Sequence, residues 1–390
     1  MGLWKSSTMA AAIAVMALAG TAFTISAAQT QPASLKTPWG EPDLQGIWTD
    51  EAATPLQRPA RFASQEFFTE EQRAELDRER SSLQGRDQRG ARGSELDVAG
   101  AYNAEFSSIR RTGRRTSMII DPPNGRIPPI TEEARKIAAE DRDFRLALLQ
   151  STPTCRLQLD ACAGGKYDPK PTTRRLEKPA RYNTARMNRH NDVEDGALAD
   201  RCLTGGLPEF GAGNGGGSFR RIVQTPGGIT MYYDVGQGQG WQRTIVMNGG
   251  PHLPSHIRQW FGDSRGHWEG NTLVVDVTNF SPKSDYRGSR ENLHLVERWI
   301  RTGAGTLEYV VTVDDPTVWT KAWTVKQEFA KQSNEENRIY YEPRCFEGNY
   351  GHPTVLKNSR QEDREFAEGK GPDPATKDNA SGFGGDDPLQ

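Results

Sequence analysis

The residues best suited to chemistry gather in one stretch, His252 to Val275, which reads HLPSHIRQWFGDSRGHWEGNTLVV. It holds three of the six histidines of the chain, together with an aspartate, two arginines and a glutamate. Histidine beside a carboxylate is a common pair for general acid–base catalysis, and arginine can stabilise negative charge that develops in a substrate. We therefore predict catalytic roles for His252, Asp263 and Glu269, with Asp263 orienting His252 and with Arg265 binding an anionic group.

Glu297 is the sharpest single candidate, because it interrupts an apolar face. Leu295 and Trp299 lie two residues away on either side, as expected for one face of a strand. A buried carboxylate is costly unless it is paired or protonated, and burial raises its pKa toward the range where a general acid or base works. A structural ion pair with an arginine such as Arg258 or Arg265 explains the same pattern, so both interpretations stay open.

Further candidates for ligand binding lie in the connections between predicted strands. They are Arg287 in SDYRGSREN, Trp268 in the opening stretch, Trp323 in DDPTVWTKAW and Tyr350 in CFEGNYG. Tryptophan and tyrosine combine apolar area with a polar atom, which suits a sugar or an aromatic compound. Structural tryptophans that cover a barrel would give the same pattern.

Other chemistry finds little support in the sequence. His252, His256 and His267 lack the HExxH spacing of zinc hydrolases, and no GxSxG motif is present. The glycine-rich residues 211–218 lack the strand and helix context of a phosphate-binding loop and are interpreted as a flexible loop. We predict no metal and no cofactor.

The elements that must position these residues are mostly strands. Between Phe219 and Glu342 the sequence alternates with period two, and Pro–Gly and Gly-rich turns separate the segments. The eight predicted strands are 220–225, 229–235, 241–247, 272–278, 292–301, 306–313, 322–329 and 338–342. They predict a mainly β fold, an antiparallel meander that closes into a calycin-like barrel, with a β-sandwich as the alternative. The segment Gly46-Ile47-Trp48 resembles the GxW of lipocalin-type barrels.

The N-terminal region is predicted to be partly helical. Thr69 and Thr131 are expected to cap helices that begin at Glu70 and Glu132, each with acidic residues in the first turn. A short helix is expected over 254–261, followed by a tight turn at Asp263–Gly266 and a hairpin connection at 268–271. The predicted domains are 29–200, with a loop at 151–200, and a β domain at 201–358, followed by a disordered tail at 359–390.

The N-terminus and the cysteines indicate the compartment. Residues 1–28 have the pattern of a cleaved signal peptide, so we expect a periplasmic or extracellular protein without a membrane span. Four cysteines in that compartment predict disulfides, with Cys155–Cys162 and Cys202–Cys345 preferred among the three possible pairings. The formal net charge of −2 gives no reason to expect nucleic-acid binding.

The long motifs resemble those of a widespread group of secreted bacterial proteins of unestablished function. They are TPWGEPDLQGIWT, DPPNGRIPPIT, GDSRGHWEGNTLVV, RGSRENLHLVERW and CFEGNYG, and the resemblance covers roughly residues 36–358. It implies secretion and a shared fold, and it carries over no catalytic residues.

Two functions follow as expectations from the residues. The first is a secreted hydrolase or lyase that uses general acid–base catalysis on a small organic or carbohydrate-like substrate. The alternative is a non-catalytic β-barrel that binds a small hydrophobic or aromatic ligand. A water-accessible cavity lined by Glu297, His252 and Arg265 would favour the enzyme, whereas a dry apolar cavity would favour the binding protein. A filled sandwich without a pocket would favour a cell-envelope interaction protein.

Overall fold

The computed structural model describes residues 35–50, 52–82, 111–157, 162, 166–203, 206–210, 219–236, 239–248, 250–332 and 350–378. The chain divides into a unit at residues 1–34, outside the described part, and a compact unit from Leu35 to Gln390. The predicted signal peptide, the predicted strand at 338–342 and Cys345 therefore lie outside the described residues. The structure of the second unit is as follows.

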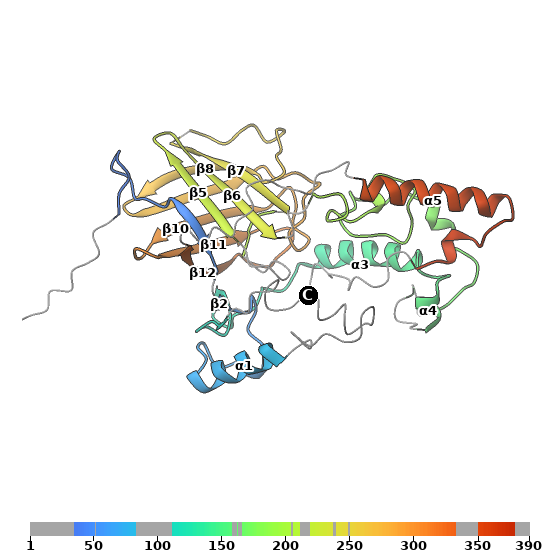
Figure 1. The fold of residues 1–390 in the computed structure, drawn as a ribbon, viewed down its shortest axis with the longest axis horizontal. Helices are drawn as coiled ribbons and strands as arrows, with labels where there is room; N and C mark the ends of the chain where they lie inside the picture. Colours follow the sequence, from blue (N-terminus) through green and yellow to red (C-terminus); the bar gives the residue numbers. More distant parts are fainter. Residues whose placement is uncertain are drawn as a thin grey trace, which may run out of the picture. The chain divides into compact units, whose positions relative to one another are not determined.

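The strands of this unit form a closed β-barrel, which confirms the predicted fold (Figure 1). Within the described part, the sheet order is β1-β5-β6-β7-β8-β9-β10-β11-β12, and β1 closes the ring by pairing with both β5 and β12. The strands are β1 (Gly46–Thr49), β5 (Phe219–Thr225), β6 (Gly228–Gly236), β7 (Gln239–Met247), β8 (Asp263–Glu269), β9 (Thr272–Thr278), β10 (His294–Arg301), β11 (Thr306–Asp314) and β12 (Trp323–Gln332).

Three short strands lie outside this ring. β4 (Ile119–Asp121) pairs with β12. β2 (Ala52–Ala53) and β3 (Arg111–Thr112) pair with each other in parallel.

The barrel departs from a simple meander at one place. β7 and β8 pair in parallel, whereas the other barrel pairs are antiparallel. The start of β8 lies beside the end of β7, with Ser264 opposite Ile245, so the predicted tight turn at Asp263–Gly266 is wrong and these residues begin β8 instead. Gly266 permits the close approach, because a Cβ atom there would lie 2.7 Å from side-chain atoms of Ile245 and Met247.

The predicted alternation sorts the side chains of β9 to β12 correctly. The inward residues are almost fully buried: Leu273, Val275, Val277, Leu295, Glu297, Trp299, Leu307, Tyr309, Val311, Val313, Trp323, Val325 and Phe329. β1 adds Trp48 to the same core, so the N-terminal segment that resembles GxW is part of the barrel and crosses the predicted domain boundary. Its indole Nε1 donates to Leu44 O at 2.8 Å.

Two of the predicted helices are present, with the predicted caps. They are α1 (Glu70–Ser82) and α3 (Glu132–Ala147). Thr69 Oγ1 accepts from Gln72 N at 3.2 Å, and Thr131 Oγ1 accepts from Ala134 N at 3.1 Å. A short α4 (Pro153–Leu157) follows α3.

The predicted helix at 254–261 is wrong. The carbonyl groups of Leu253, Pro254 and Ile257 accept from Asn279 Nδ2, at 2.8, 3.3 and 3.2 Å. Gln259 N donates to Asn279 O at 2.9 Å. Asn279, which is distant in the sequence, therefore binds the carbonyl groups that would accept hydrogen bonds within a helix.

The prediction of disorder from residue 359 is wrong for the residues up to 378. α5 (Gly351–Ala367) is a charged helix, and the residues after it contact the α4 region. Ser151 Oγ donates to Ala375 O at 3.0 Å, and Thr154 N donates to Asp378 Oδ2 at 3.0 Å. The sequence pattern missed this helix because few apolar residues mark its buried side.

The disulfide Cys155–Cys162 is formed as predicted. Cys202 is also disulfide-bonded. None of the helices in the described ranges has the length and apolar character needed to cross a membrane.

Candidate functional site

Glu297 projects from β10 into the barrel and is 0% exposed. Its carboxylate accepts three hydrogen bonds, from Arg243 Nη2 at 2.5 Å, Trp299 Nε1 at 3.2 Å and the Tyr309 hydroxyl at 3.0 Å. Glu297 therefore forms a buried ion pair, as the structural interpretation of the sequence predicted. Its partner is Arg243 of β7, whereas the sequence suggested Arg258 or Arg265. Parity within β7 could have identified Arg243, since it lies two residues from Trp241 and Ile245 on the inward face.

The surroundings of this ion pair leave no space for a substrate. Tyr309 and Trp299 stack at 4.1 Å between ring centroids, and each is about 1% exposed. Exposure near zero means that no water-sized space adjoins these side chains. Burial and then the charge of Glu297 raise the pKa of Tyr309 well above its ordinary value. Burial alone would lower the pKa of Arg243, but the charge of Glu297, the interaction with Tyr233, the hydrogen bond to Glu297 and the interaction with Tyr309 together outweigh it and raise that pKa.

His252 lies on the outer wall of the barrel and is 27% exposed. Its Nδ1 is 2.9 Å from Asp263 Oδ2, as the predicted orienting role requires, and its Nε2 is 2.9 Å from Asp276 Oδ1. His294 Nε2 lies 3.0 Å from the other oxygen of Asp276. Both ring nitrogens of His252 therefore lie within hydrogen-bond distance of carboxylate oxygens on the outer wall.

Asp263 anchors the connection between β7 and β8. Its Oδ2 accepts from Leu253 N at 3.0 Å and from Arg265 Nε at 2.9 Å, in addition to facing His252. Burial would raise the pKa of Asp263, but the hydrogen bonds from Arg265, Leu253 N–H and His252 outweigh it and hold the pKa below its ordinary value. Arg265 is thus occupied by Asp263 and does not point at an open anion site.

Glu269 stands on the same outer face, near the end of β8. Its carboxylate is 2.8 Å from Arg298 Nη1 and 3.2 Å from His267 Nε2. The hydrogen bond from Arg298, followed by that from His267, lowers the pKa of Glu269. A lowered pKa favours the ionised form and suits an ion pair at the surface.

The predicted catalytic group is therefore not assembled in one place. Glu297 faces the barrel interior, whereas His252, Asp263, Arg265 and Glu269 belong to the outer wall, on the opposite side of the sheet. A strand alternates its side chains between two faces, so residues of opposite parity cannot line one cavity within a closed wall. The cavity that would have favoured the enzyme is not formed by these residues.

The four predicted binding residues also lie in different surroundings. Trp323 is fully buried in the core, and Trp268 packs against that core while partly exposed. Arg287 occupies a turn with φ of 52° next to Tyr286, which stacks on Trp323 at 6.3 Å. Tyr350 is 93% exposed before α5. In the described ranges, no group of three or more His, Cys, Asp or Glu side chains could hold a metal ion.

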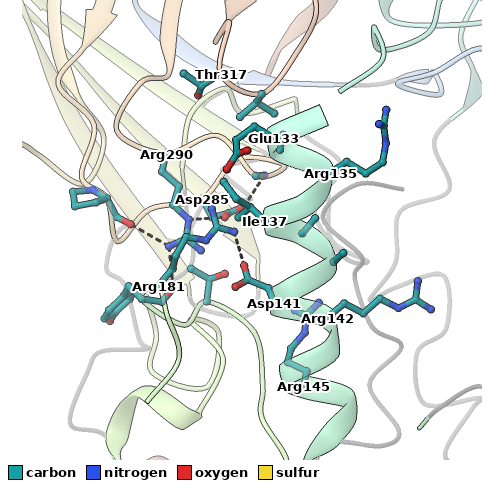
Figure 2. Close-up of a pocket in the computed structure, with 18 of the residues that line it drawn as sticks. Glu133, Arg135, Ile137, Asp141, Arg142, Arg145, Arg181, Asp285, Arg290 and Thr317 are labelled. Carbon is teal, nitrogen blue, oxygen red and sulfur yellow. Dashed lines mark hydrogen bonds and ion pairs between the residues drawn. The ribbon is translucent and has the colours of Figure 1, made fainter. Parts of the chain in front are cut away.

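A cavity of about 1210 Å³ lies instead beside α3, outside the barrel interior (Figure 2). One wall is the face of α3 that carries Ala134, Ile137, Ala138, Asp141 and Arg145, which recur every three or four residues. The opposite walls come from three loops, with lining residues 181–184, 282–292 and 315–318. Sequence reasoning missed this site, because its walls come together only in the tertiary structure.

α3 is fixed against the barrel at its N-terminus. Thr131 N donates to Val318 O at 2.8 Å, and Thr131 Oγ1 donates to Thr317 O at 2.8 Å. Thr320 N donates to Pro129 O at 2.9 Å. The cap of α3 is therefore also the joint between the helix and the β11–β12 connection, so this end of the cavity has fixed walls.

Ion pairs define the middle of the cavity. Arg181 pairs with Asp141 of α3, and the two side chains point toward each other in Figure 2. Arg290 Nε donates to Asp285 Oδ2 at 3.0 Å, and its Nη1 donates to Tyr182 O at 2.9 Å. Arg181, Asp141 and Arg290 also line a neighbouring cavity of about 290 Å³. The pair between α3 and the loop thus stands where the two cavities meet.

Comparisons with known proteins bear on the fold alone. Neither a protein-family model nor a curated protein sequence matches the chain. Among solved structures, a secretary abundant heat soluble (SAHS) protein from Ramazzottius varieornatus matches with a TM-score of 0.23 and 15% identity, over 32% of this chain and 79% of that one. Wild-type fluorescent protein UnaG matches with a TM-score of 0.20 and 16% identity, over 30% of this chain and 73% of that one.

Proposed function

We propose that this protein is a non-catalytic binding protein for a small hydrophobic or aromatic ligand, and that the ligand occupies the cavity beside α3. The observation that carries the proposal is the cavity itself, about 1210 Å³ in volume. Cavities that hold small organic molecules usually have volumes of about 300–1,000 Å³, with apolar walls and a few fixed polar groups. The α3 cavity, at about 1210 Å³, slightly exceeds that range and has both features.

The apolar part of the wall is contributed by α3 and the loop after β11. Ala134 packs against the barrel core while remaining partly exposed, Ile137 lines the cavity beside it, and Val318 continues the same surface. A ligand that covers this surface gains roughly 25 cal/mol for each Å² of apolar area that it removes from water. Among the described residues, aromatic side chains such as Trp299 and Tyr309 are buried in the barrel interior and expose almost no apolar surface there.

The polar groups around the cavity suit recognition better than catalysis. Asp285 and Arg290 hold each other, and Asp315 accepts from Ser289 Oγ at 2.5 Å and from Thr317 N at 2.9 Å. Groups fixed in this way can orient a ligand without moving. The enzyme interpretation would need its acid–base residues at the cavity, and neither Glu297 nor His252 is among the residues that line it.

A neutral fluorescent probe, N-phenylnaphthylamine, tests the proposal with the purified mature protein. We expect saturable binding with increased fluorescence in the wild type, and loss of binding in Ala138→Trp, since the indole would fill the cavity. Lys136→Trp is the matched control, because Lys136 lies on α3 but is exposed and does not line the cavity.

Circular dichroism and the melting temperature would show whether Ala138→Trp is folded. If that variant fails to fold, hydrogen–deuterium exchange on the wild type gives a second measurement, in which the probe should protect the amides of residues 133–146. Equal probe binding by Ala138→Trp and the wild type, or no probe-dependent protection of α3, would refute the α3 cavity as the binding site.

A further inference from the structure

The charges around the α3 cavity are distributed unevenly along the helix. Glu133 lies near the N-terminus of α3 and Arg145 near its C-terminus, about 18 Å apart at the rise of an α-helix. Between them stand Asp141 and its partner Arg181. The apolar wall residues Ala134, Ile137 and Ala138 occupy the N-terminal half of this face, and Leu146 lines the cavity near the C-terminus of α3. A ligand that follows the helix would therefore meet an apolar surface first and arginines at the far end.

Most of the charged side chains at that far end already have partners. Arg181 is paired with Asp141, and Arg290 is paired with Asp285. These pairs are close to electrically neutral as units, so neither provides an uncompensated charge for a ligand. Their role is to shape the wall and to hold the loop residues against α3.

Two cations at this end are different, because neither makes an ion pair in the described structure. Arg145 lines both the α3 cavity and the neighbouring one, where Tyr182 also lines both. Lys283 Nζ lies 5.1 Å from the centroid of the Tyr182 ring. Arg135 and Arg142 also line the cavity, but in Figure 2 they point away from the loops that face α3. Arg145, which lines both cavities, and Lys283, which lines the α3 cavity against Tyr182, are therefore cations that can contact a ligand in the α3 cavity.

We infer that the ligand of the α3 cavity is an amphiphile with an anionic group, which Arg145 and Lys283 bind while its apolar part covers Ala134, Ile137 and Ala138. This inference rests on the proposed binding function and narrows it to a class of ligand. Arg181 has a buried Nε atom without a hydrogen-bond partner, which adds a donor at the same end of the cavity. Guanidinium and ammonium groups form their strongest hydrogen bonds with carboxylate, sulfonate or phosphate oxygens.

A structural role for Arg145 is the competing explanation. Arg145 lies in the last turn of α3, where a cation stabilises the helix dipole without any ligand. That role predicts that removing the charge destabilises the helix and lowers the affinity for every ligand to the same extent. Binding of an anionic group predicts a selective loss, so a pair of probes that differ only in charge separates the two.

Anilinonaphthalene sulfonate and N-phenylnaphthylamine form such a pair, since they share the aromatic body and differ in the sulfonate. We expect the wild type to bind the sulfonate probe more tightly than the neutral probe. Arg145→Gln should weaken the affinity for the sulfonate probe by about tenfold, the usual effect of losing one charge-assisted hydrogen bond. Lys283→Gln should act in the same direction. Neither variant should change the affinity for the neutral probe. A higher salt concentration should weaken the binding of the sulfonate probe and leave the binding of the neutral probe unchanged.

Lys136→Gln is the matched control, because it removes a positive charge from the exposed side of α3. The inference is refuted if the wild type shows no preference for the sulfonate, or if Arg145→Gln weakens both probes equally. In those cases binding of the neutral probe would leave the proposed function intact. If neither probe binds the wild type, the proposed function itself fails.

Discussion

At Glu297 the cost of burying a carboxylate is offset by three donors, Arg243, Trp299 and Tyr309. The alternation of apolar residues around Glu297 predicted its burial correctly. The sequence could not show which arginine faces it, because Arg243 lies 54 residues earlier in the chain. Pairing between strands, and not sequence spacing, brings the two charges together.

The first prediction concerns this pair. Glu297→Gln keeps the shape of the side chain but leaves Arg243 buried without a countercharge, so we expect a loss of about 3–5 kcal/mol in the free energy of unfolding. Urea denaturation of the purified protein measures it. Glu328→Gln, an exposed carboxylate on the outward face of β12, is the control and should change stability by less than about 0.5 kcal/mol.

Replacing both partners by apolar residues gives a second check. Glu297→Leu combined with Arg243→Met should cost less than Glu297→Leu alone, because no unpaired charge remains in the core. If Glu297→Gln is as stable as the wild type, the carboxylate does not compensate Arg243 and the structural account of Glu297 is incorrect.

Among the elements, the connection between β7 and β8 shows how a distant contact overrides a local pattern. Pro254 and the residues after it favour a helix. In the structure, however, the Asn279 side chain donates to the carbonyl group of Pro254, and the amide of Leu253 donates to the Asp263 carboxylate. The strand β8 can begin at Asp263 only because this connection is held against the outer wall. The helices α1 and α3 follow their local signals, since their caps lie within a few residues of the first turn.

The anchoring by Asp263 predicts a dependence of stability on pH. The pKa of this carboxyl is lower in the folded protein than the value of about 3.9 expected when unfolded, so its ionised form stabilises the fold. This contribution is fully present above the unfolded pKa and disappears as the pH falls through the folded pKa. Asp263→Asn should therefore lower the melting temperature at pH 6 and make little difference at the lowest pH where the protein still folds.

Melting curves of both proteins from neutral to acid pH measure this convergence. Glu291→Gln is the control, because its carboxylate is exposed and forms no ion pair in the described part of the chain. A gap between wild type and Asp263→Asn that stays constant over the whole acid range would mean that Asp263 acts by packing and not by its charge.

For the molecule as a whole, β1 decides whether the sheet is open or closed. This strand of four residues pairs with both β5 and β12, and its Trp48 is fully buried in the core. The predicted domain boundary at residue 200 separated this segment from the barrel. Its sequence separation from both partner strands explains why a local pattern could not assign it with certainty.

The last prediction follows from this closure. Trp48→Ala should lower the free energy of unfolding by about 3–5 kcal/mol, because it removes a large side chain from the closed core. Trp39→Ala, a partly exposed tryptophan in the same N-terminal segment, should cost about 0.5 kcal/mol or less. Similar small losses for both variants, measured by urea denaturation and near-ultraviolet circular dichroism, would show that β1 is not needed to close the barrel.

The sequence by itself determined the elements whose causes are local: the period of the strands, their buried faces, and the caps of α1 and α3. The disulfide Cys155–Cys162 was a preference among three possible pairings, and the structure confirms it. These depend on the two-residue and 3.6-residue repeats of the chain and on neighbours a few residues apart. Only the tertiary structure decided that Glu297 faces Arg243, that His252 and Glu269 stand on the other side of the wall, and that a cavity lies beside α3. Each of these depends on which distant segments meet, because the closure of the sheet separates its two faces and the packing of α3 leaves the space.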